Sequence, residues 1–372
     1  MSRVCSHNEW DPLEEVIVGI GVPSTLPALE FSFKLFFHDN VYGKLYGDGM
    51  SHSVASCNQY ITKQLVEEHN EDVENFALLL QGIGITVRRP KMPKKVYKIQ
   101  TPWWESGVYP ALNTRDLSMV VGNEIIESSS TCRWRYFETD FLKHLFHEYF
   151  ISGAKWTCAP RPLVLDSSFD LSYILGTNQE SKDYYTKLIA DDDHYMKYGY
   201  EIMFDAANCI RLGTHILMNA SNRNAKLGAE WLQRHLGSKY KVLTTDVADT
   251  HIDSTILPLR PGLAITTRPD IKKYMPEELQ SWEYIYVAPI DRPTDRYDFT
   301  LASPRIDLNV LSISPDCIIC HSEYETVLSK QLKPYGIEVI PSQMRHCEIF
   351  AGAHHCVTLD IRRAGSLEDY FA

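Results

Sequence analysis

Short apolar runs recur along the chain in pairs, and each pair is followed by a stretch with helical spacing. The clearest copy begins at residue 308, where the runs LNVLSIS and CIICHS flank a Pro-Asp turn. Apolar side chains then recur at helical spacing from Tyr324 to Tyr335, and Gly336 is suited to end the helix. The run IEVIPS follows as a closing strand. This pattern predicts a unit of strand, turn, strand, helix and strand.

Four further stretches repeat this order of elements. They are residues 209–247 with a helix over 222–236, residues 115–160 with a helix near 136–150, a unit that begins at EEVIVGI and closes with a helix near 69–81 and ITVRRP, and a less regular unit after STILPLRPGLAITT. Residues 22–60 and 165–200 fit the unit poorly. Five such units predict an α/β or α+β fold built with pseudo-symmetry.

The composition narrows the class of protein. The 372 residues carry a net charge of −11, which argues against nucleic acid or an anionic membrane as main partner and suits a cationic substrate. No apolar run is long enough to span a membrane, and the first residues lack the pattern of a signal peptide. The nine cysteines are scattered and odd in number, so we expect a reducing, cytoplasmic location. Cys317-Ile-Ile-Cys320 lacks a second ligand pair, so we predict a buried strand there and no metal site.

The stretch THIDST, residues 250–255, is a first candidate for chemistry. It precedes an apolar strand, and in an extended chain His251 and Asp253 would share one face. An imidazole beside a carboxylate can act as a tuned acid or base. Such a pair is also common on solvated strand faces, so the alternative of a merely structural pair stays open.

The stretch GAHHCVTLDIRR near the end of the chain is a second candidate. If residues 354–360 are extended, His354 and Cys356 point to one side and His355 to the other. We therefore expect His355 to be a structural histidine, whereas His354 could border a site. Cys356 itself could be a nucleophile or a small buried residue.

Two aspartates stand before strands in different units: Asp116 in NTRDLSMVVGNEIIE and Asp205 in MFDAANCIRLG. Aspartate is common at turns before strands, which would explain each of them singly. If the units surround a common axis, however, these positions would converge on one site.

Taken together, these stretches resemble the amidinotransferase family, which includes glycine amidinotransferase and inosamine-phosphate amidinotransferase. The matching phrases, in chain order, are RDLSMVVGNEIIE, CRWRYFE, GAKWTCAPRP, FDAANCIR, NAKLGAEWLQRHL, HIDST, LNVLSISP and HHCVTLDIRRAGSLEDY, with HNEWDPLEEVIVG near the start. Within the family, the likeness is to the cyanobacterial branch that serves saxitoxin and other guanidino-alkaloid biosynthesis. The resemblance implies one domain over residues 1–372 with the pentein fold, a five-bladed α/β propeller with pseudo-fivefold symmetry.

The resemblance also implies roles for the candidate residues. Cys356 would be the nucleophile, His251 the general acid and base, and Asp205 the carboxylate that orients His251. Asp116 and Asp253 would hold the guanidinium of L-arginine. A thiolate suits this reaction because a guanidinium carbon is a poor electrophile, and an amidino-cysteine intermediate would release L-ornithine before an amine acceptor attacks. No metal or organic cofactor is implied, and relatives suggest a homodimer.

Two departures from the family pattern bear on the acceptor. Arg268 is displaced by about two places from the arginine expected to bind a substrate carboxylate, and Asp270 stands in that place. Asp307 stands where the family often has serine, and it would disfavour a carboxylate acceptor. We therefore expect an amine acceptor other than glycine. Glycine transfer, a guanidine hydrolase or deiminase of the same fold, and a catalytically inactive binding protein are the alternatives.

Overall fold

The computed structural model contains five three-stranded sheets, here called blades 1 to 5. It describes residues 3–25, 32–33, 60–91, 98–109, 112–170, 199–248, 251–288, 290, 300–302 and 306–371. Blade 1 consists of β19 (Thr358–Arg363), β1 (Leu13–Val18) and β4 (Thr86–Arg88), and blade 2 of β7 (Ser118–Val121), β8 (Glu124–Glu127) and β9 (Lys155–Cys158). Blade 3 consists of β10 (Cys209–Leu212), β11 (His215–Asn219) and β12 (Lys241–Thr245), and blade 4 of β13 (Ile256–Arg260), β14 (Leu263–Thr266) and β15 (Glu283–Tyr286). Blade 5 consists of β16 (Leu311–Ser314), β17 (Cys317–His321) and β18 (Glu338–Ser342).

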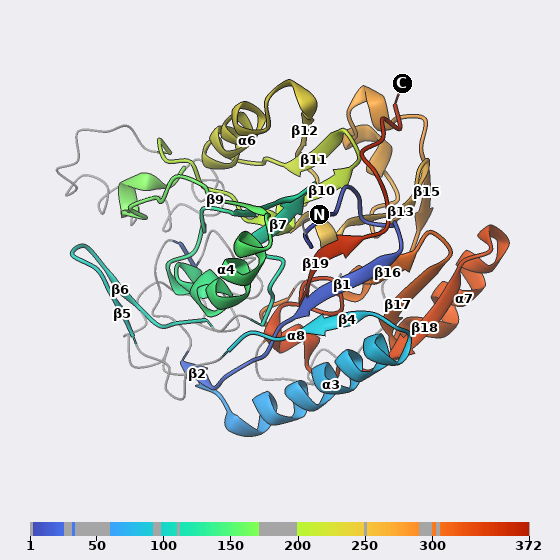
Figure 1. Cartoon of the computed structure of the whole chain (residues 1–372), viewed down its shortest axis with the longest axis horizontal. Coiled ribbons are helices and arrows are strands. Elements are labelled where there is room, and N and C mark those ends of the chain that lie inside the picture. Colours follow the sequence, from blue (N-terminus) through green and yellow to red (C-terminus); the bar gives the residue numbers. More distant parts are fainter. Residues whose placement is uncertain are drawn as a thin grey trace, which may run out of the picture.

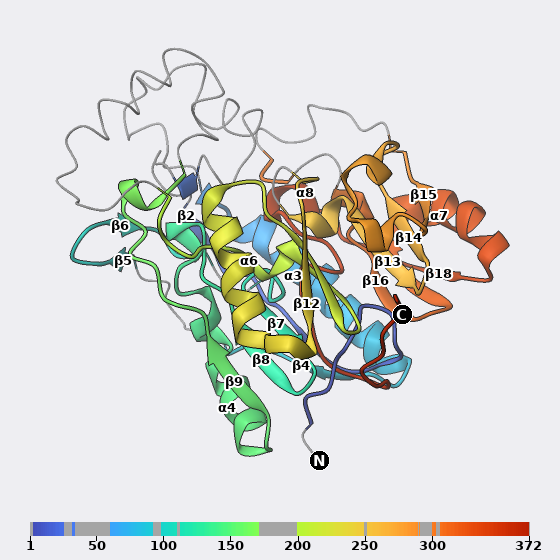
Figure 2. The ribbon, with the colours of Figure 1, turned by 90° about the horizontal axis from the view of Figure 1, so that it is seen from above.

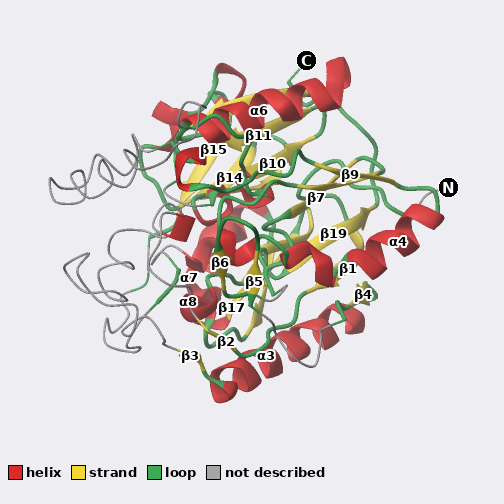
Figure 3. Ribbon diagram, turned by 90° about the vertical axis from the view of Figure 1, so that its left-hand side faces the viewer, coloured by secondary structure: helices red, strands yellow, loops and turns green. Residues whose placement is uncertain are grey.

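All five blades share one topology. The first strand pairs antiparallel with the second, and the second pairs parallel with the third. A parallel neighbour requires a crossover, which a helix usually provides. The crossover helices are α3 (Lys63–Gly82), α4 (Lys143–Ile151), α6 (Arg223–Leu236) and α7 (Glu325–Leu332), and they lie outside the strands (Figures 1 and 3). In blade 4, two short 3-10 turns, Ile271–Tyr274 and Glu277–Leu279, stand where the other blades have the helix. The repeated unit expected from the sequence is thus confirmed, including its less regular copy.

Five apolar clusters join the blades into a ring. Each cluster combines strand residues of two consecutive blades, and the fifth joins blade 5 back to blade 1. In β1, Val16 and Val18 pack with Leu311 of blade 5, whereas Ile17 packs with Val120 of blade 2. Because successive strand residues face opposite sides, a strand buried on both faces is apolar throughout. This is why the strands appear in the sequence as continuous apolar runs, and the ring is the expected pentein propeller.

Blade 1 contains a strand that was not expected from the sequence. The sequence suggested that it begins with EEVIVGI, but its first strand is β19, from the end of the chain. Val16 pairs with Asp360 and Val18 with Thr358, so the two ends of the chain complete one sheet. Figure 1 shows β19 beside β1. No local pattern could indicate this pairing, because the two strands lie at opposite ends of the sequence.

The N-terminal segment crosses three blades before it enters β1. Isolated bridges join Cys5 to Arg362, Ser6 to Gly122, and Asn8 to Leu212. Next to the last of these, Gly213 has a φ of +68°, and a Cβ there would lie 2.1 Å from the Glu368 carbonyl oxygen. Only glycine tolerates both the positive φ and the close approach of the carbonyl oxygen. Gly213 therefore allows this turn and the C-terminal segment to pack in direct backbone contact.

The remaining elements are short. They are the strand pairs β2 (Ser24–Thr25) with β3 (Tyr60–Ile61) and β5 (Ile99–Gln100) with β6 (Glu105–Ser106), the helix α8 (Cys347–Phe350), and 3-10 turns at Arg133–Arg135, Glu138–Phe141, Asp166–Ser168, Ala206–Asn208, Gly237–Lys239, Ile252–Ser254, Ile306–Leu308, Ser322–Tyr324 and Lys333–Tyr335. Figure 2 shows α8 on the side of the ring opposite the N-terminus. Within the described ranges, no helix is both long and apolar enough to cross a bilayer.

Candidate active site

Five of the candidate residues lie just before the first strand of a blade. Asp116 precedes β7, Asp205 precedes β10, His251 and Asp253 precede β13, and Cys356 precedes β19. The five first strands start at the same end of the ring, so residues far apart in sequence meet there. The convergence expected from pseudo-symmetry is therefore seen in the structure.

Cys356 is buried, with 1% of its surface exposed. Its Sγ lies 3.3 Å from Asp253 Oδ2 and 3.1 Å from Asn309 Nδ2. Burial raises the pKa of the thiol well above its ordinary value, and the carboxylates of Asp253 and Asp116 act in the same direction. The hydrogen bond from Asn309 acts against them. With these neighbours alone the thiol keeps its proton at neutral pH, so a bound cation would favour its ionisation.

His251 lies between two carboxylates. Its Nε2 is 3.0 Å from Asp205 Oδ2, and its Nδ1 is 3.6 Å from Asp116 Oδ2. Burial lowers the pKa of His251, but Asp116 and Asp205 outweigh it and raise the pKa to about 9. Asp205 is held in turn by the backbone N–H and hydroxyl of Thr131, each 3.2 Å from Oδ1. His251 is therefore a protonated acid near neutral pH, oriented by a fixed carboxylate.

A buried arginine holds Asp116. Arg135 donates from Nη1 to Asp116 Oδ2 at 2.6 Å and binds Glu138 through Nε and Nη2. Burial raises the pKa of Asp116, while Arg135 and His251 lower it. Burial also raises the pKa of Glu138 to about 8, against the effect of Arg135. Arg135 thus supplies the charge that lets a fully buried carboxylate stand beside His251.

Two carboxylate oxygens in this site have no hydrogen-bond partner among the described residues. They are Asp116 Oδ1 and Asp253 Oδ1, both buried. Buried acceptors in proteins are nearly always satisfied, because an unsatisfied one costs about 1–3 kcal/mol. The two oxygens therefore suit a ligand with N–H donors and positive charge.

The local conformation of THIDST differs from the expected strand. His251 is extended, but Ile252–Ser254 form a 3-10 turn before β13. The shared strand face proposed for His251 and Asp253 is therefore wrong. The turn places the two side chains differently: His251 contacts Asp205, whereas Asp253 contacts Cys356.

The orientation expected for the two adjacent histidines is also wrong. Residues 354–357 form a turn, and extended structure begins only at Thr358, so strand alternation does not apply. His355 contributes to the site: its Nδ1 lies 2.8 Å from Asp253 Oδ2 and its Nε2 lies 3.4 Å from Glu9 Oε2. His354 instead meets the ring of Phe76 on α3 edge-on, with 4.8 Å between ring centroids, and burial lowers its pKa to about 3.

Arg268, which the sequence proposed as a substrate-binding residue, makes its described contacts away from Cys356. Arg268 donates from Nη1 to the Val247 carbonyl at 3.0 Å, lies 3.4 Å from Asp270, and stacks 4.1 Å above the ring of Tyr274. The backbone of Asp307 belongs to the turn Ile306–Leu308, but its side chain lies outside the described residues.

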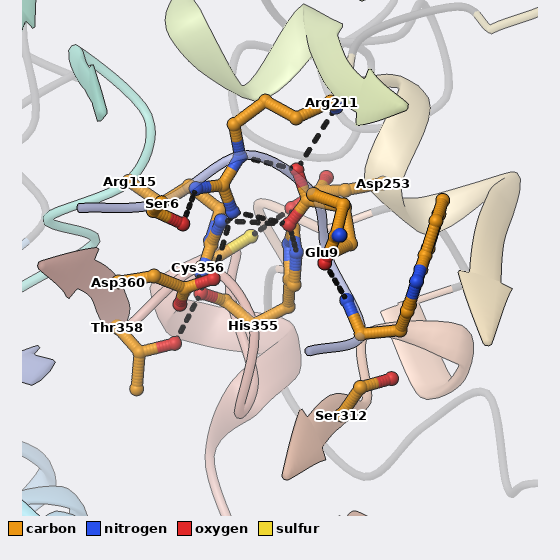
Figure 4. Close-up of polar contacts among 12 residues, drawn as sticks. Ser6, Glu9, Arg115, Arg211, Asp253, Ser312, His355, Cys356, Thr358 and Asp360 are labelled. Carbon is orange, nitrogen blue, oxygen red and sulfur yellow. Dashed lines mark hydrogen bonds and ion pairs between the residues drawn. The ribbon is translucent and has the colours of Figure 1, made fainter. Parts of the chain in front are cut away.

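Behind His355, a cluster of buried charges fills the middle of the ring. Arg211 binds both oxygens of Glu9 at 2.7 and 2.6 Å, and it binds Asp360 at 2.7 Å. Arg115 binds Glu9, Asp360 and the carbonyl of His355. Figure 4 shows how this central ionic cluster connects through His355 to Asp253 and Cys356. It comes from blades 1, 2 and 3 and from the N-terminal segment.

The sequence did not single out Asn309, Glu9 and Arg135, and it indicated only a structural role for His355. A signal for Asn309 exists, because it stands two places before β16 as Asp116 and Cys356 do before β7 and β19. Glu9 and Arg135 lie within HNEWDP and CRWRYFE, two of the phrases that carry the family resemblance, but no local pattern marks either charged residue as buried. Among the residues the structure describes, no group of histidine, cysteine and carboxylate side chains is arranged to hold a metal ion.

The charge on His251 makes stability depend on pH. A histidine whose pKa is raised by folding adds stability that is fully present below its unfolded pKa, near 6.5, and is lost as the pH rises through about 9. We expect Asp205→Asn to destabilise the protein most near pH 6, with a deficit that shrinks as the pH rises from 6.5 to 9. Urea unfolding at pH 6, 7.5 and 9 measures this deficit.

Asp166→Asn is the matched control. Asp166 pairs with Arg133 at 2.6 Å, and arginine does not titrate in this range, so its deficit should stay constant with pH. A deficit of Asp205→Asn that is constant or grows from pH 6 to 9 would contradict the charge assigned to His251.

No protein-family model matches the chain. The chain is 34% identical over 380 residues to inosamine-phosphate amidinotransferase 1 of Streptomyces glaucescens, an alignment that covers 100% of the chain and 99% of that protein. It is 33% identical over 381 residues to L-arginine:L-lysine amidinotransferase of Pseudomonas savastanoi pv. phaseolicola, covering 99% and 97%. The structure of SxtG, an amidinotransferase from Microseira wollei in the saxitoxin biosynthetic pathway, matches with a TM-score of 0.80 and 32% identity over 99% of this chain and 100% of that one.

The chain therefore belongs to the amidinotransferase family, and it is an enzyme that transfers amidino groups. A dimethylarginine dimethylaminohydrolase matches with a TM-score of 0.54 over 93% of this chain, at 11% identity. That likeness concerns the fold alone, which the transferase shares with hydrolases.

Proposed function

We propose that the enzyme transfers the amidino group of L-arginine to an amine other than glycine, through a covalent amidino-Cys356 intermediate, and releases L-ornithine. The observation that carries the proposal is the pair of unpartnered oxygens, Asp116 Oδ1 and Asp253 Oδ1, in the site that holds the Cys356 thiol. A planar guanidinium donates several N–H groups and bears the charge these carboxylates would match.

The first half-reaction uses Cys356 as nucleophile and His251 as acid. Arginine bound between Asp116 and Asp253 adds a positive charge near the sulfur, so the thiol releases its proton to solvent on binding and the thiolate forms. The thiolate attacks Cζ, the guanidinium carbon of arginine, and the bond from Cζ to arginine Nε breaks. His251 gives its proton to the leaving nitrogen, which departs as ornithine. Cys356 then carries a cationic amidino-thioether, and His251 is neutral.

The second half-reaction reverses these roles. The acceptor amine attacks the amidino carbon and gives a proton to His251, and the carbon–sulfur bond breaks to restore the thiolate. Asp205 acts by holding His251 in position through both steps. Because His251 lies between the carboxylates of Asp116 and Asp205, these two residues stabilise its protonated state.

Two observations support an acceptor other than glycine. Arg268 is engaged by Val247 and Asp270, so the arginine that could bind a carboxylate is already paired. The structural relative SxtG belongs to the saxitoxin pathway, which supports a toxin or alkaloid intermediate as acceptor. Asp307, as proposed from the sequence, would attract a second ammonium group of the acceptor.

Labelled arginine provides the test. The protein incubated with arginine alone should gain the mass of one amidino group on the peptide containing Cys356, with release of ornithine. Lysine, amino ketones and glycine are then added separately; at least one of the amines other than glycine should remove the label as amidinated product, whereas glycine should leave the adduct in place. Citrulline, or ornithine with urea, would instead indicate a hydrolase or deiminase, and no adduct together with no ornithine would exclude the proposal.

A further inference from the structure

Asn309 occupies the same place in blade 5 that Cys356 occupies in blade 1, and its side chain reaches across to the cysteine. It is buried, with 1% of its surface exposed. Its Oδ1 accepts the backbone N–H groups of Ala353 at 3.0 Å and Cys356 at 2.8 Å. Its own carbonyl accepts the N–H of His355 at 3.1 Å. One residue therefore holds three amides of the loop that carries the thiol.

The amide orientation of Asn309 follows from these contacts. Because Oδ1 faces two N–H donors, the NH2 group must point the other way. Its two hydrogens face Cys356 Sγ at 3.1 Å and Asp253 Oδ2 at 3.0 Å. All donors and acceptors of the side chain are thus used, and none of them can serve another partner without breaking one of these bonds.

The bond to sulfur gains strength when the thiol ionises. The neutral thiol donates to Asp253 Oδ2, a contact of 3.3 Å that becomes a repulsion between two negative atoms after ionisation. The Asn309 N–H then faces a full negative charge, and hydrogen bonds to charged acceptors are about twice as strong as neutral ones. It also continues to hold the Asp253 oxygen, which separates the like charges.

We propose that Asn309 is a further catalytic residue, which stabilises the Cys356 thiolate through its side-chain N–H while holding Asp253 and the nucleophile loop in place. The role rests on the proposed function of Cys356 as nucleophile. The same hydrogen bond acts when the acceptor amine displaces the sulfur, because the Asn309 N–H can donate again to the departing thiolate. Asn309 thereby serves both half-reactions.

The loop is also held from blade 2, which keeps the sulfur in position. Asn113 donates to the carbonyls of Phe350 at 3.0 Å and Ala351 at 3.3 Å. A Cβ at Gly352 would lie 2.3 Å from Asn113 Oδ1 and 2.8 Å from Cys356 Cβ. The loop therefore has little room to move the sulfur away from Asn309.

The pH dependence of Cys356 alkylation tests the proposal. Wild type, Asn309→Ala and Asn309→Asp are treated with iodoacetamide across pH 6 to 11, and the modified peptide is quantified by mass spectrometry. We expect the midpoint of Asn309→Ala to rise by about one to two pH units, and alkylation below the wild-type midpoint to slow about 10- to 100-fold. Asn309→Asp keeps an oxygen for the two backbone N–H groups but places a carboxylate oxygen by the sulfur, so its midpoint should rise further.

Asn224→Ala is the control for a merely structural role. Asn224 is also buried and ties loops together, donating to the carbonyls of Ser168 and Glu201, both at 2.8 Å. Its loss should lower the melting temperature and leave the alkylation midpoint unchanged. A folded Asn309→Ala or Asn309→Asp with the wild-type midpoint would overturn the proposal. The readout needs no arginine, so failure of the wild type to form the arginine adduct would exclude the proposed function separately.

Discussion

Replacing Cys356 with serine should leave a folded protein that no longer releases ornithine from arginine. Serine matches the size of cysteine, and the backbone contact of Cys356 with Asn309 remains, so the fold should persist. A serine hydroxyl ionises far less readily than a thiol and attacks a guanidinium poorly, so we expect turnover to fall by about 1,000-fold or more. Ornithine release and intact mass after incubation with arginine measure the effect.

Cys320→Ser is the matched control for this substitution. Cys320 is fully buried in β17, donates to the carbonyl of His321 at 3.3 Å, and has its pKa raised to about 12 by burial. It lies in blade 5, away from the contacts of Cys356, so its serine variant should retain wild-type turnover. Undiminished ornithine release by Cys356→Ser would exclude Cys356 as the nucleophile. Undiminished biological function of this variant without ornithine release would instead favour the alternative of a catalytically inactive binding protein.

Arg211→Met should cause the largest loss of stability among single substitutions of the central ionic cluster. Arg211 binds Glu9 through two bonds and Asp360 through one, and all three side chains are buried. Burial alone would raise the pKa of Glu9, but Arg211 holds it well below its usual range, so Glu9 stays charged at neutral pH. Removing the arginine leaves the buried carboxylates of Glu9 and Asp360 with too little positive charge beside them. We therefore expect the free energy of unfolding to fall by about 3–5 kcal/mol.

Denaturant unfolding at pH 7.5, followed by tryptophan fluorescence, measures this loss. Arg234→Met is the control, because Arg234 forms an exposed pair with Glu230 on α6 at 3.0 Å, with side chains 80% and 59% exposed. Its loss should change stability by less than about 0.5 kcal/mol. If Arg211→Met behaved like this control, Arg115 and Arg363 would suffice to balance the buried acids.

Much of the fold could be predicted because its strands are buried on both faces. The centres of CIICHS and THILMNAS are apolar because consecutive residues enter different inter-blade clusters: Ile318 and Ile319 enter two different clusters, and so do Ile216 and Leu217. The regular spacing of such runs then makes the repeated unit recognisable. The partner of β1 could not be predicted, since the pairing of Val16 with Asp360 depends on how the whole ring closes. The local pattern of apolar and polar residues does not indicate which distant segment pairs with a strand.

The candidate site was predictable to the extent that residue type and place before a strand suffice. Asp116, Asp205, His251, Asp253 and Cys356 all meet those conditions and gather at one end of the ring. The position of His355 could not be derived, because it depends on where a turn gives way to β19. The role of Glu9 could not be predicted for a different reason. A glutamate near the N-terminus is normally exposed, and the burial of Glu9 is favourable only because Arg211 and Arg115, which belong to other blades, pair with it.

The pairing of β19 with β1 has a consequence for the order of events during synthesis. Of the strands in the five blades, the ribosome delivers β1 first and β19 last, so blade 1 and the cluster between blades 1 and 2 cannot be completed until residues 358–363 have emerged. Cys356 directly precedes β19 and depends on the same closure for its place. A nascent chain that has not yet released β19 therefore has neither a closed ring nor a positioned thiol, so the reactive centre forms only after the strands of the other four blades have been synthesised.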